Sequence, residues 1–346
     1  MKHILFINNY DMEKSRDSYL KEKSPSHHQF GISELINTNE YDVDYMLATP
    51  RNVKHRVLKL LSLLPIWFKI YWRARKYDIV YGGADFTVDF LGVMKKVKLF
   101  RPKLIAIFHH PPFMLRIKYT KYDHIIFLSP FAYEEMKYAF PQKAAKMSFI
   151  QWGPDLFFYQ SLATIPNHLK KQNKIIFISN GKTKRDHEIL VNAAEHLHAH
   201  TVIVSDKQSI PANFNKGHCH YTDIILSEQP DDTKMVDILN KCSILVIPTP
   251  ATPQKLGPIG LTSFLDAVAL GMPIITADNT VFSDIVASYK MGFVYKAGDL
   301  TELEKAMNFF ISQPKFIAEY GENAYKFGQK NSIKEFAEQL YQLFNE

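Results

Sequence analysis

The chain has 346 residues, 46% of them hydrophobic, which predicts about two globular domains with real cores. It carries 42 Lys plus Arg against 35 Asp plus Glu, and this net charge of +7 favours an anionic partner: a nucleotide, a phosphate, nucleic acid or an acidic membrane surface. The two cysteines, Cys219 and Cys242, form no disulfide framework and favour a reduced, cytoplasmic setting. The short apolar run at the N-terminus predicts a first strand rather than a signal peptide.

The N-terminal half alternates short apolar runs with helical segments. A polar, charged loop is expected after the first run, and a helix is expected to begin near Ile32. The runs predict buried strands at residues 3–8, 41–48, 77–81, 104–108, 124–128 and 148–151. Because these runs are separated by helices, they indicate a parallel sheet with helices on both faces. Ligands of such sheets lie beyond the carboxyl ends of the strands, which would bring five residues towards one cleft: Gly31, Gly82, His109, His110 and Ser129.

Residues 51–75 form an unusual insertion, an apolar stretch with a basic perimeter. Its uninterrupted apolar core is shorter than the ~20 residues needed to span a bilayer, and we expect Pro65 to break it. One interpretation is a pair of helices that cover the sheet. The other is an element at a membrane surface, with Trp67 and Trp72 in the lipid boundary. Its basic residues would then face anionic headgroups: Arg51, Lys54, Arg56, Lys59, Lys69 and Arg73. Nucleic acid is not expected as a partner, because no recognition-helix, zinc or RNA-platform signature accompanies the charge.

A second pattern of strands and helices follows residues 152–154 and a polar segment at 161–173, which we interpret as the interdomain linker. Strands are expected at 174–179, 201–205, 243–248 and 292–295, and helices at 185–198, 234–240, 300–312 and 333–344. The pattern predicts a second doubly wound domain, so the cleft between two such domains is the expected site. The predicted domains are 1–160 and 161–330, with a helix at about 330–346 that could pack back on the first.

Residues 256–278 are predicted to form a glycine-bearing loop, a short helix and a buried strand. Thr262 or Ser263 is placed to cap the helix start, and Gly271 stands where a left-handed residue ends a helix. One apolar face recurs at helical spacing in Leu261, Phe264, Leu265 and Val268.

The loop before this helix has the features of a phosphate site. Gly257 and Gly260 let its backbone approach a ligand closely. The free N–H groups and the positive dipole end of the helix would then point at that ligand, which suits a phosphate. The alternative is an ordinary helix–strand unit in a core, because loop-to-helix turns are common and mostly structural.

Several motifs occur in an order that has a counterpart in a known family. They include IIFISNGKTKRDHEILVNAA, SILVIPTP and GLTSFLDAVALGMPIITAD, together with the Gly31 loop, the histidines at 109–110, Ser129 and the segment WGPDLFF. Taken together they resemble the GT-B glycosyltransferases, specifically the large retaining class called glycosyltransferase family 4, which includes many bacterial polysaccharide-building enzymes. The likeness covers nearly the whole chain.

The resemblance implies an α/β protein of the GT-B fold: two doubly wound, Rossmann-like parallel-sheet domains facing a central cleft. The first would bind the acceptor and the second the nucleotide-sugar donor. Lys182 and Arg185 fall near the family's two cationic positions, which neutralise the donor diphosphate, and His110 falls at the histidine beside the donor sugar. These three are the expected catalytic residues. The expected donor-binding residues are Gly31, Gly181, Lys182, Arg185, Gly257, Ile259, Gly260, Leu261, Thr262 and Asp266.

The chemistry of sugar transfer suits these residue types. Breaking the bond between an anomeric carbon and a nucleoside diphosphate develops charge on two phosphates, with an oxocarbenium-like sugar. Lys182, Arg185 and backbone N–H groups would stabilise the departing diphosphate without a metal. No metal-ligand cluster appears in the sequence, so no metal and no cofactor besides the donor substrate is expected. The alternative for the two cations is a solvated polar loop, and for His110 a loop histidine stacked on the following prolines.

Two departures from the family pattern concern its pair of glutamates. The second corresponds to Asp266, a shorter carboxylate that could still meet the ribose hydroxyls; its alternative role is first-turn capping of the helix. Eight residues earlier stands Pro258, which has no acidic side chain. The sequence therefore predicts an unusual donor site.

The expected function is transfer of a sugar from a nucleotide-sugar donor, with retention, to a saccharide or lipid-linked saccharide acceptor in cell-surface polysaccharide or glycoconjugate synthesis. The enzyme is expected in the cytoplasm, peripheral on the inner face of the membrane. The alternative hypotheses are a nucleotide-sugar epimerase of the same architecture and a non-catalytic saccharide-binding or scaffold protein. A dinucleotide oxidoreductase is disfavoured, because no G-x-G-x-x-G follows the first strand.

Overall fold

The computed structural model describes residues 1–48, 56–109, 113–170, 174–210, 214, 219–226, 231–252 and 257–346, and the side chains of helical residues 56–63 are not described. The chain divides into two units. Unit 1 comprises Met1–Lys21, Ser26–Trp152 and Ile333–Glu346, and unit 2 comprises Glu22–Pro25 and Gly153–Ser332.

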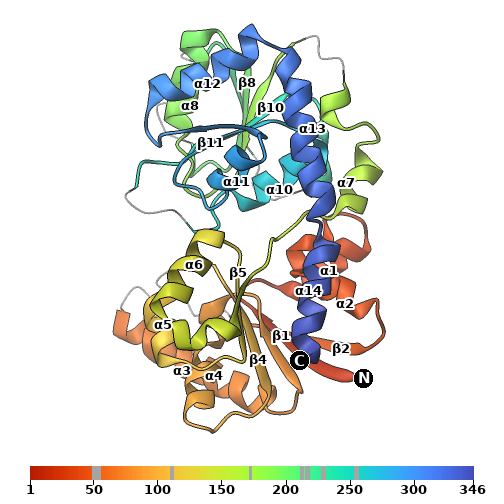
Figure 1. The fold of residues 1–346 in the computed structure, drawn as a ribbon, viewed down its shortest axis with the longest axis vertical. Helices are drawn as coiled ribbons and strands as arrows, with labels where there is room; N and C mark the ends of the chain where they lie inside the picture. The colour runs from red at the N-terminus through yellow and green to blue at the C-terminus, as the bar shows by residue number, and fades with distance from the viewer. Residues whose placement is uncertain are drawn as a thin grey trace. The chain divides into compact units, whose positions relative to one another are not determined.

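Unit 1 is built on a parallel sheet with strand order β2-β1-β3-β4-β5-β6. Its strands are β1 (Lys2–Asn8), β2 (Tyr41–Leu47), β3 (Ile79–Gly82), β4 (Lys103–Phe108), β5 (His124–Phe127) and β6 (Met147–Phe149). The longer helices are α1 (Met12–Leu20), α2 (Ile32–Ile36), α3 (Arg56–Ala74), α4 (Asp85–Lys96), α5 (Phe113–Tyr119), α6 (Pro130–Ala139) and α14 (Ile333–Asn345) (Figure 1). The continuous apolar runs explain this sheet, because parallel strands are buried on both faces.

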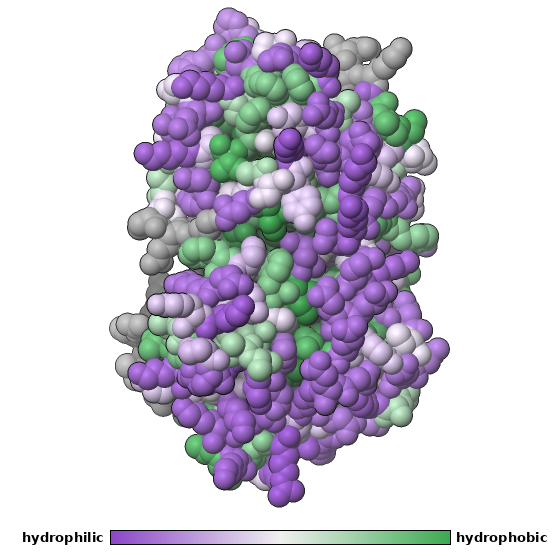
Figure 2. Space-filling model, in the orientation of Figure 1, coloured by the Kyte–Doolittle hydropathy of each residue, from purple (hydrophilic) through white to green (hydrophobic). Residues whose placement is uncertain are grey.

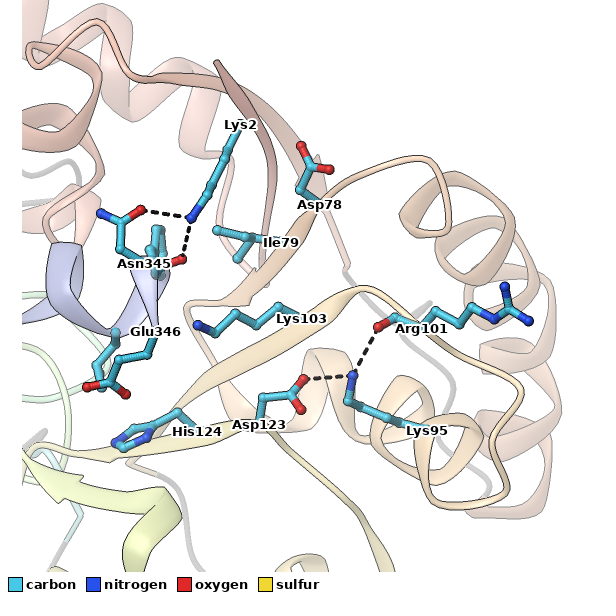
Figure 3. A pocket seen from close by; sticks show the side chains of 12 residues that line it. Lys2, Asp78, Ile79, Lys95, Arg101, Lys103, Asp123, His124, Asn345 and Glu346 are labelled. Atoms are coloured by element: carbon cyan, nitrogen blue, oxygen red, sulfur yellow. Dashed lines mark hydrogen bonds and ion pairs between the residues drawn. The ribbon is translucent and has the colours of Figure 1, made fainter.

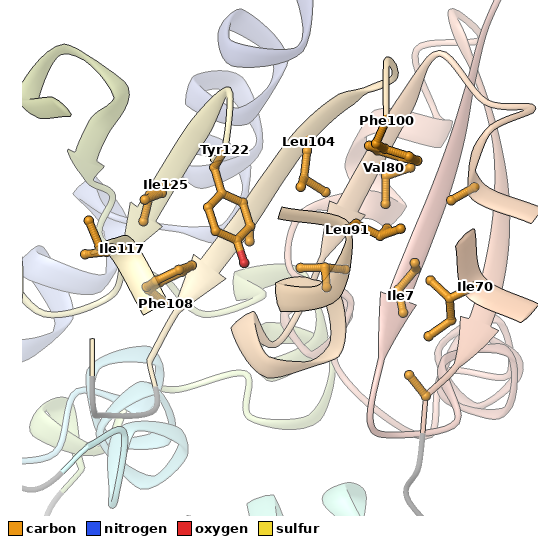
Figure 4. Close-up of a cluster of buried hydrophobic side chains, with 14 of the residues drawn as sticks. Ile7, Ile70, Val80, Leu91, Phe100, Leu104, Phe108, Ile117, Tyr122 and Ile125 are labelled. Carbon is orange, nitrogen blue, oxygen red and sulfur yellow. The ribbon is translucent and has the colours of Figure 1, made fainter. Parts of the chain in front are cut away.

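The core of unit 1 lies between the sheet and α3, α4 and α5. Figure 4 shows residues from β1, β3 and β4 meeting side chains of these helices and of the loops before β4 and β5. Its buried members include Ile7, Ile70, Val80, Leu91, Phe100, Leu104, Phe108, Ile117, Tyr122 and Ile125.

Unit 2 repeats the architecture with strand order β12-β11-β10-β7-β8-β9, again all parallel. Its strands are β7 (Phe177–Asn180), β8 (Thr201–Ser205), β9 (Thr222–Leu226), β10 (Ile244–Ile247), β11 (Ile274–Ala277) and β12 (Gly292–Tyr295). Its helices are α7 (Leu156–Leu162), α8 (His187–Leu197), α9 (Asp232–Leu239), α10 (Leu261–Leu270), α11 (Ser283–Ser288), α12 (Leu300–Ser312) and α13 (Lys315–Lys330). The prediction of two doubly wound α/β sheets is confirmed.

Some local predictions were wrong. The expected polar loop after β1 contains α1, which sequence periodicity misses because Met12 is its only buried residue. Pro65 does not break its segment: α3 runs through it as one helix of 19 residues. The expected linker instead packs on unit 2, where the Asn167 side-chain amide donates to the carbonyls of Leu239 (3.0 Å) and Cys242 (3.1 Å).

Unit 2 also contains elements that the sequence analysis missed, namely α7, β9, α11 and α13, and the reasons for β9 and α13 differ. β9 is an edge strand with a largely exposed surface, so it has no continuous apolar run. Helix α13 contains Gly321 and Gly328, residues that usually count against a helix. Both glycines let α13 approach α10 closely, since a Cβ on Gly328 would lie 2.6 Å from the Val268 carbonyl oxygen and one on Gly321 would lie 2.5 Å from that of Gly271.

Candidate functional site

Helix α10 and the loop before it stand at the centre of the candidate site in unit 2. Gly260 is the N-cap residue in a left-handed conformation (φ +85°), and a Cβ there would lie 2.7 Å from Ile247 Cγ2. A side chain is therefore excluded by conformation and by space. Gly260 supplies no capping side chain, and the Leu261 N–H donates to the Pro258 carbonyl (3.1 Å). The N–H groups of Thr262 and Ser263 are therefore the first-turn donors of α10 that remain, among the described residues, for another acceptor.

The rest of α10 is anchored in the core. The predicted apolar face is confirmed, because Leu261, Phe264, Leu265 and Val268 are all at most 1% exposed. Gly271 ends the helix in the left-handed conformation that the sequence predicts. Thr262 is the one exposed residue of the helix, and residues 257–259 of the loop are half-buried. A ligand can therefore reach only the N-terminal end of α10.

Ser263 does not cap the helix as expected. Its hydroxyl donates to the Asn180 carbonyl (3.0 Å) and accepts from Arg185 Nη2 (3.2 Å). The physical reason is that the first turn of α10 packs against the end of β7, which offers a carbonyl with no strand partner beyond it. Ser263 thus joins the two loops that were predicted separately to bind the donor diphosphate.

Arg185 folds back over a glycine at the end of β7. Gly181 has a φ of +126°, and a Cβ there would lie 2.6 Å from Arg185 Nη2. The guanidinium donates to three acceptors: the Asn180 carbonyl (3.2 Å), the Thr183 carbonyl (3.1 Å) and the Ser263 hydroxyl. The predicted residues Gly181, Arg185 and the start of α10 are therefore brought together.

The Arg185 guanidinium is held in place by neutral acceptors. Its acceptors are carbonyls and a hydroxyl, and among the residues that the structure describes no carboxylate pairs with it. Burial lowers the pKa of Arg185 to about 10, so the guanidinium stays protonated at neutral pH. Its buried Nε has no partner within the described ranges. A fixed cation beside a helix N-terminus is an arrangement that suits a phosphate or diphosphate.

Lys182 lies in the same loop and is half-buried. The Ser209 hydroxyl donates to the Lys182 carbonyl oxygen, and the Ser209 backbone N–H donates to Asp206 Oδ1 (2.8 Å). Hydrogen bonding from Ser209, with a smaller contribution from the charge of Lys182, lowers the pKa of Asp206. The neighbouring segment therefore interacts with the Lys182 backbone and side chain, and the role of Lys182 towards a diphosphate stays a prediction.

Asp266 has partners that the sequence did not suggest. Its side chain is buried; Oδ1 accepts from the Tyr159 hydroxyl (2.5 Å) and Oδ2 from Asn180 Nδ2 (2.8 Å). Burial raises the pKa of Asp266 to about 7, against the lowering effect of these two hydrogen bonds. Both carboxylate oxygens are thus engaged inside unit 2, and neither caps α10. Asn180 carries a local signal, a polar residue directly before the loop glycine, whereas Tyr159 carries none.

The remaining predicted residues belong to unit 1. Gly31 is the left-handed N-cap of α2 (φ +82°), and a Cβ there would lie 3.1 Å from Phe336 Cδ1 of α14, so packing by itself explains this glycine. His110 lies outside the described residues. His109 stacks on Phe30 with ring centroids 6.3 Å apart. His27, in the same loop as Phe30, is fully buried, and burial holds its pKa well below the usual value.

A pocket of about 540 Å³ lies at the N-terminal ends of the unit 1 strands, away from the carboxyl ends where the predicted residues lie (Figure 3). It is lined by charged side chains that include Lys2, Lys95, Lys103, Asp123 and Glu346, and Lys95 pairs with Asp123 at 2.7 Å. No predicted site residue lines it.

Within the described ranges, no three His, Cys, Asp or Glu side chains gather as metal ligands. On the face shown in Figure 2, hydrophilic residues cover most of the surface.

Comparisons with known proteins bear on the family and the fold. Residues 162–327 match the family model described as "Glycosyl transferases group 1". No curated protein matches the sequence. Among solved structures, the chain is similar to a sucrose-phosphate synthase from Thermosynechococcus elongatus, with 15% identity, a TM-score of 0.69 and coverage of 100% of this chain and 98% of that one.

Two further solved structures have a similar fold. Anabaena Alr3699/HepE in complex with UDP-glucose has 15% identity and a TM-score of 0.69, with both chains covered to 100%. WaaG, a glycosyltransferase involved in lipopolysaccharide biosynthesis, has 10% identity and a TM-score of 0.65, with both chains covered to 99%. The two parallel sheets and these similarities define a GT-B fold. The match to the group 1 glycosyl transferases lies in the second unit, at residues 162–327.

Proposed function

We propose that the protein transfers a sugar from a nucleotide-diphosphate sugar, with retention of anomeric configuration, to a saccharide or lipid-linked saccharide acceptor in cell-surface polysaccharide or glycoconjugate synthesis. The observation that carries the donor assignment is the Arg185 guanidinium, held by neutral acceptors beside the uncapped start of α10. HepE, which has a similar fold, binds UDP-glucose, and this supports a nucleotide-sugar donor.

In this mechanism the chain's own groups stabilise the leaving diphosphate. Arg185 and the first-turn N–H groups of α10 would neutralise charge as the bond to the anomeric carbon breaks. Lys182 would supply the second cation, and His110 would hydrogen-bond the donor sugar. Because these groups carry the charge, we propose that no metal and no cofactor is required, and that neither chelator treatment nor added Mg²⁺ changes the rate.

Binding of nucleoside diphosphates tests the donor site. We expect one of UDP, GDP or ADP to bind, and Arg185→Ala to weaken that binding by about 10-fold to 100-fold, the range for a hydrogen bond from a charged group. Lys305→Ala, which removes an exposed charge on α12, is the matched control and should bind like the wild type. Equal binding by Arg185→Ala and the wild type would contradict the donor assignment.

A nucleotide-sugar panel separates the rival functions. Slow hydrolysis of one nucleotide sugar, or transfer to an added saccharide, supports a glycosyltransferase. Epimerisation of the sugar without transfer would indicate a nucleotide-sugar epimerase. Saccharide binding with no response to any nucleotide would indicate a non-catalytic binding protein. The anomeric configuration of a transferred sugar, read by NMR, tests retention.

We also propose that the protein acts in the cytoplasm, on the inner face of the membrane, through α3. One face of α3 packs on the core of unit 1 through Ile70 and Ala74. The opposite face exposes Leu64, Phe68 and Trp72, whose side chains are 50–65% exposed. An amphipathic helix with exposed aromatic and basic residues suits an anionic lipid surface. The described helices include none that is long and apolar enough to cross a membrane.

Part of the predicted membrane element has another role. Trp67 stacks on Phe90 of α4, with ring centroids 5.2 Å apart, and Arg73 pairs with Asp44 at 3.6 Å. Both residues therefore contact unit 1 itself. Arg51 and Lys54 lie outside the described residues, and the side chains of Arg56 and Lys59 are likewise outside them. The proposal thus rests on the exposed face of α3 alone.

A further inference from the structure

A continuous series of buried hydrogen bonds connects α7 to Arg185. The Tyr159 hydroxyl of α7 donates to Asp266 Oδ1, and Asn180 Nδ2 donates to Asp266 Oδ2. Asn180 is the last residue of β7, and its carbonyl oxygen accepts from the Ser263 hydroxyl and from Arg185 Nη2. The series therefore runs from Tyr159 through Asp266, Asn180 and Ser263 to the guanidinium.

The members of this series are enclosed by unit 2. The side chains of Tyr159, Asn180, Ser263 and Asp266 are between 2% and 7% exposed. They come from three elements, α7, β7 and α10, which are separated by many residues along the chain. Buried hydrogen bonds are expensive to break, because a donor or acceptor left without a partner keeps its full desolvation cost. The series therefore fixes the end of β7 with a precision that packing alone does not give.

We propose that Tyr159, Asp266 and Asn180 are positioning residues that hold Arg185 at the first turn of α10, and that Asp266 acts through Arg185 rather than by contacting the donor ribose. This inference rests on the proposed donor site. It assigns a task to a carboxylate whose two oxygens are both engaged inside the protein.

The physical basis is the rigidity of one peptide group. Asp266 anchors the Asn180 side chain, so the Asn180 carbonyl, in the planar peptide that joins it to Gly181, is held in one direction. That carbonyl is an anchor for the guanidinium. A direct pair between Asp266 and Arg185 would cancel the charge that a diphosphate needs. Linking them through a neutral amide orients Arg185 and leaves its charge available.

A double-mutant cycle on the intact protein tests whether the positioning residues act through Arg185. The probe is whichever of UDP, GDP or ADP binds the wild type, measured by isothermal titration calorimetry. We expect Tyr159→Phe to weaken binding by about 3-fold to 10-fold, the range for one buried hydrogen bond. In a protein that already carries Arg185→Ala, adding Tyr159→Phe should weaken binding by less than about 2-fold, because the effects of substitutions at coupled sites are not additive. Asp266→Asn should show the same coupling; if it fails to fold, the Tyr159→Phe cycle decides.

Inorganic pyrophosphate, used as a competitor, distinguishes the diphosphate from the ribose. Pyrophosphate has no ribose, so Tyr159→Phe should weaken pyrophosphate binding by the same factor as nucleotide binding. Tyr295→Phe is the matched control: this buried hydroxyl of unit 2 has no partner among the described residues, and its loss should leave binding unchanged.

Two results would overturn the inference and leave the donor site standing: additive effects of Tyr159→Phe and Arg185→Ala, or unchanged pyrophosphate binding by Tyr159→Phe while nucleotide binding weakens. If Arg185→Ala alone changes nothing, the donor assignment and the positioning role fail together. The single Arg185 variant therefore separates a failure of the proposed function from a failure of the inference.

Discussion

At the scale of single residues, the donor site depends on conformations that only particular side chains permit. Gly181 has a positive φ, and Arg185 lies over it where a Cβ would stand. The sequence indicated a basic loop with a glycine. It did not indicate that the glycine makes room for the arginine, because that contact depends on the backbone of residues 181–185.

Gly181→Ala should therefore displace Arg185. We expect nucleoside diphosphate binding to weaken by about 10-fold or more, since the guanidinium must give up at least one charge-assisted hydrogen bond. Calorimetry on folded protein, with far-UV circular dichroism as the check on folding, measures this effect. Wild-type affinity in the alanine variant would show that Arg185 does not need its present position.

Asp266 predicts a pH dependence of stability. Its pKa in the folded protein is about 7, raised from its usual value of 3.8 by burial. The folded state thus binds the Asp266 proton more tightly than the unfolded state does. The contribution of this proton to the free energy of unfolding is therefore complete below about pH 4 and is lost as the pH rises through 7.

The comparison with Asp266→Asn isolates this contribution. We expect the free energy of unfolding of the wild type, relative to the variant, to fall between pH 4 and pH 7 by up to about 1.4 kcal/mol per pH unit. Denaturant titrations at several pH values measure it. A difference that is constant across this window, or that grows with pH, would contradict the raised pKa.

At the scale of elements, α10 and α13 approach each other closely through the glycines of α13. Gly328 lets the backbone of α13 approach the Val268 carbonyl, as described above. We expect Gly328→Ala to lower the stability of unit 2 by about 1–3 kcal/mol, because a methyl group cannot fit without moving backbone. Gln329→Ala, at the exposed neighbouring position, should change it by less than about 0.5 kcal/mol. Chemical unfolding of both variants provides the comparison, and equal stabilities would exclude this packing role.

Helix α3 carries the membrane proposal at the same scale. We expect the wild type to float with vesicles that contain anionic lipid, and Phe68→Ser with Trp72→Ser to reduce the bound fraction by about 10-fold or more, since each exposed ring removes apolar area from the lipid boundary. Tyr138→Ser on α6 is the matched control, because Tyr138 is 90% exposed. The proposal fails if the wild type does not float, or if all three proteins float equally.

At the scale of the whole molecule, a donor analogue should stabilise one unit in particular. A nucleoside diphosphate at 100 times its Kd should stabilise the folded state by about 2.7 kcal/mol. Hydrogen exchange should show the protection in the loop at residues 181–186 and the first turn of α10, and little change in α4 and α5 of unit 1. Protection that is strongest in unit 1 would contradict the assignment of the donor to unit 2.

The sequence by itself determined the alternation of buried strands and helices that predicts two parallel sheets, the helix at 261–270 with its apolar face and its final glycine, and the basic loop after β7. The signals for these features are local, because periodic apolar residues and single glycines carry them within each short segment. The tertiary structure alone decided that Ser263 binds the end of β7 and that α13 is a helix despite its glycines. It also decided that Asp266 meets Tyr159, a residue 107 positions away. Such contacts follow from the packing of distant elements, for which one sequence carries no periodic signal.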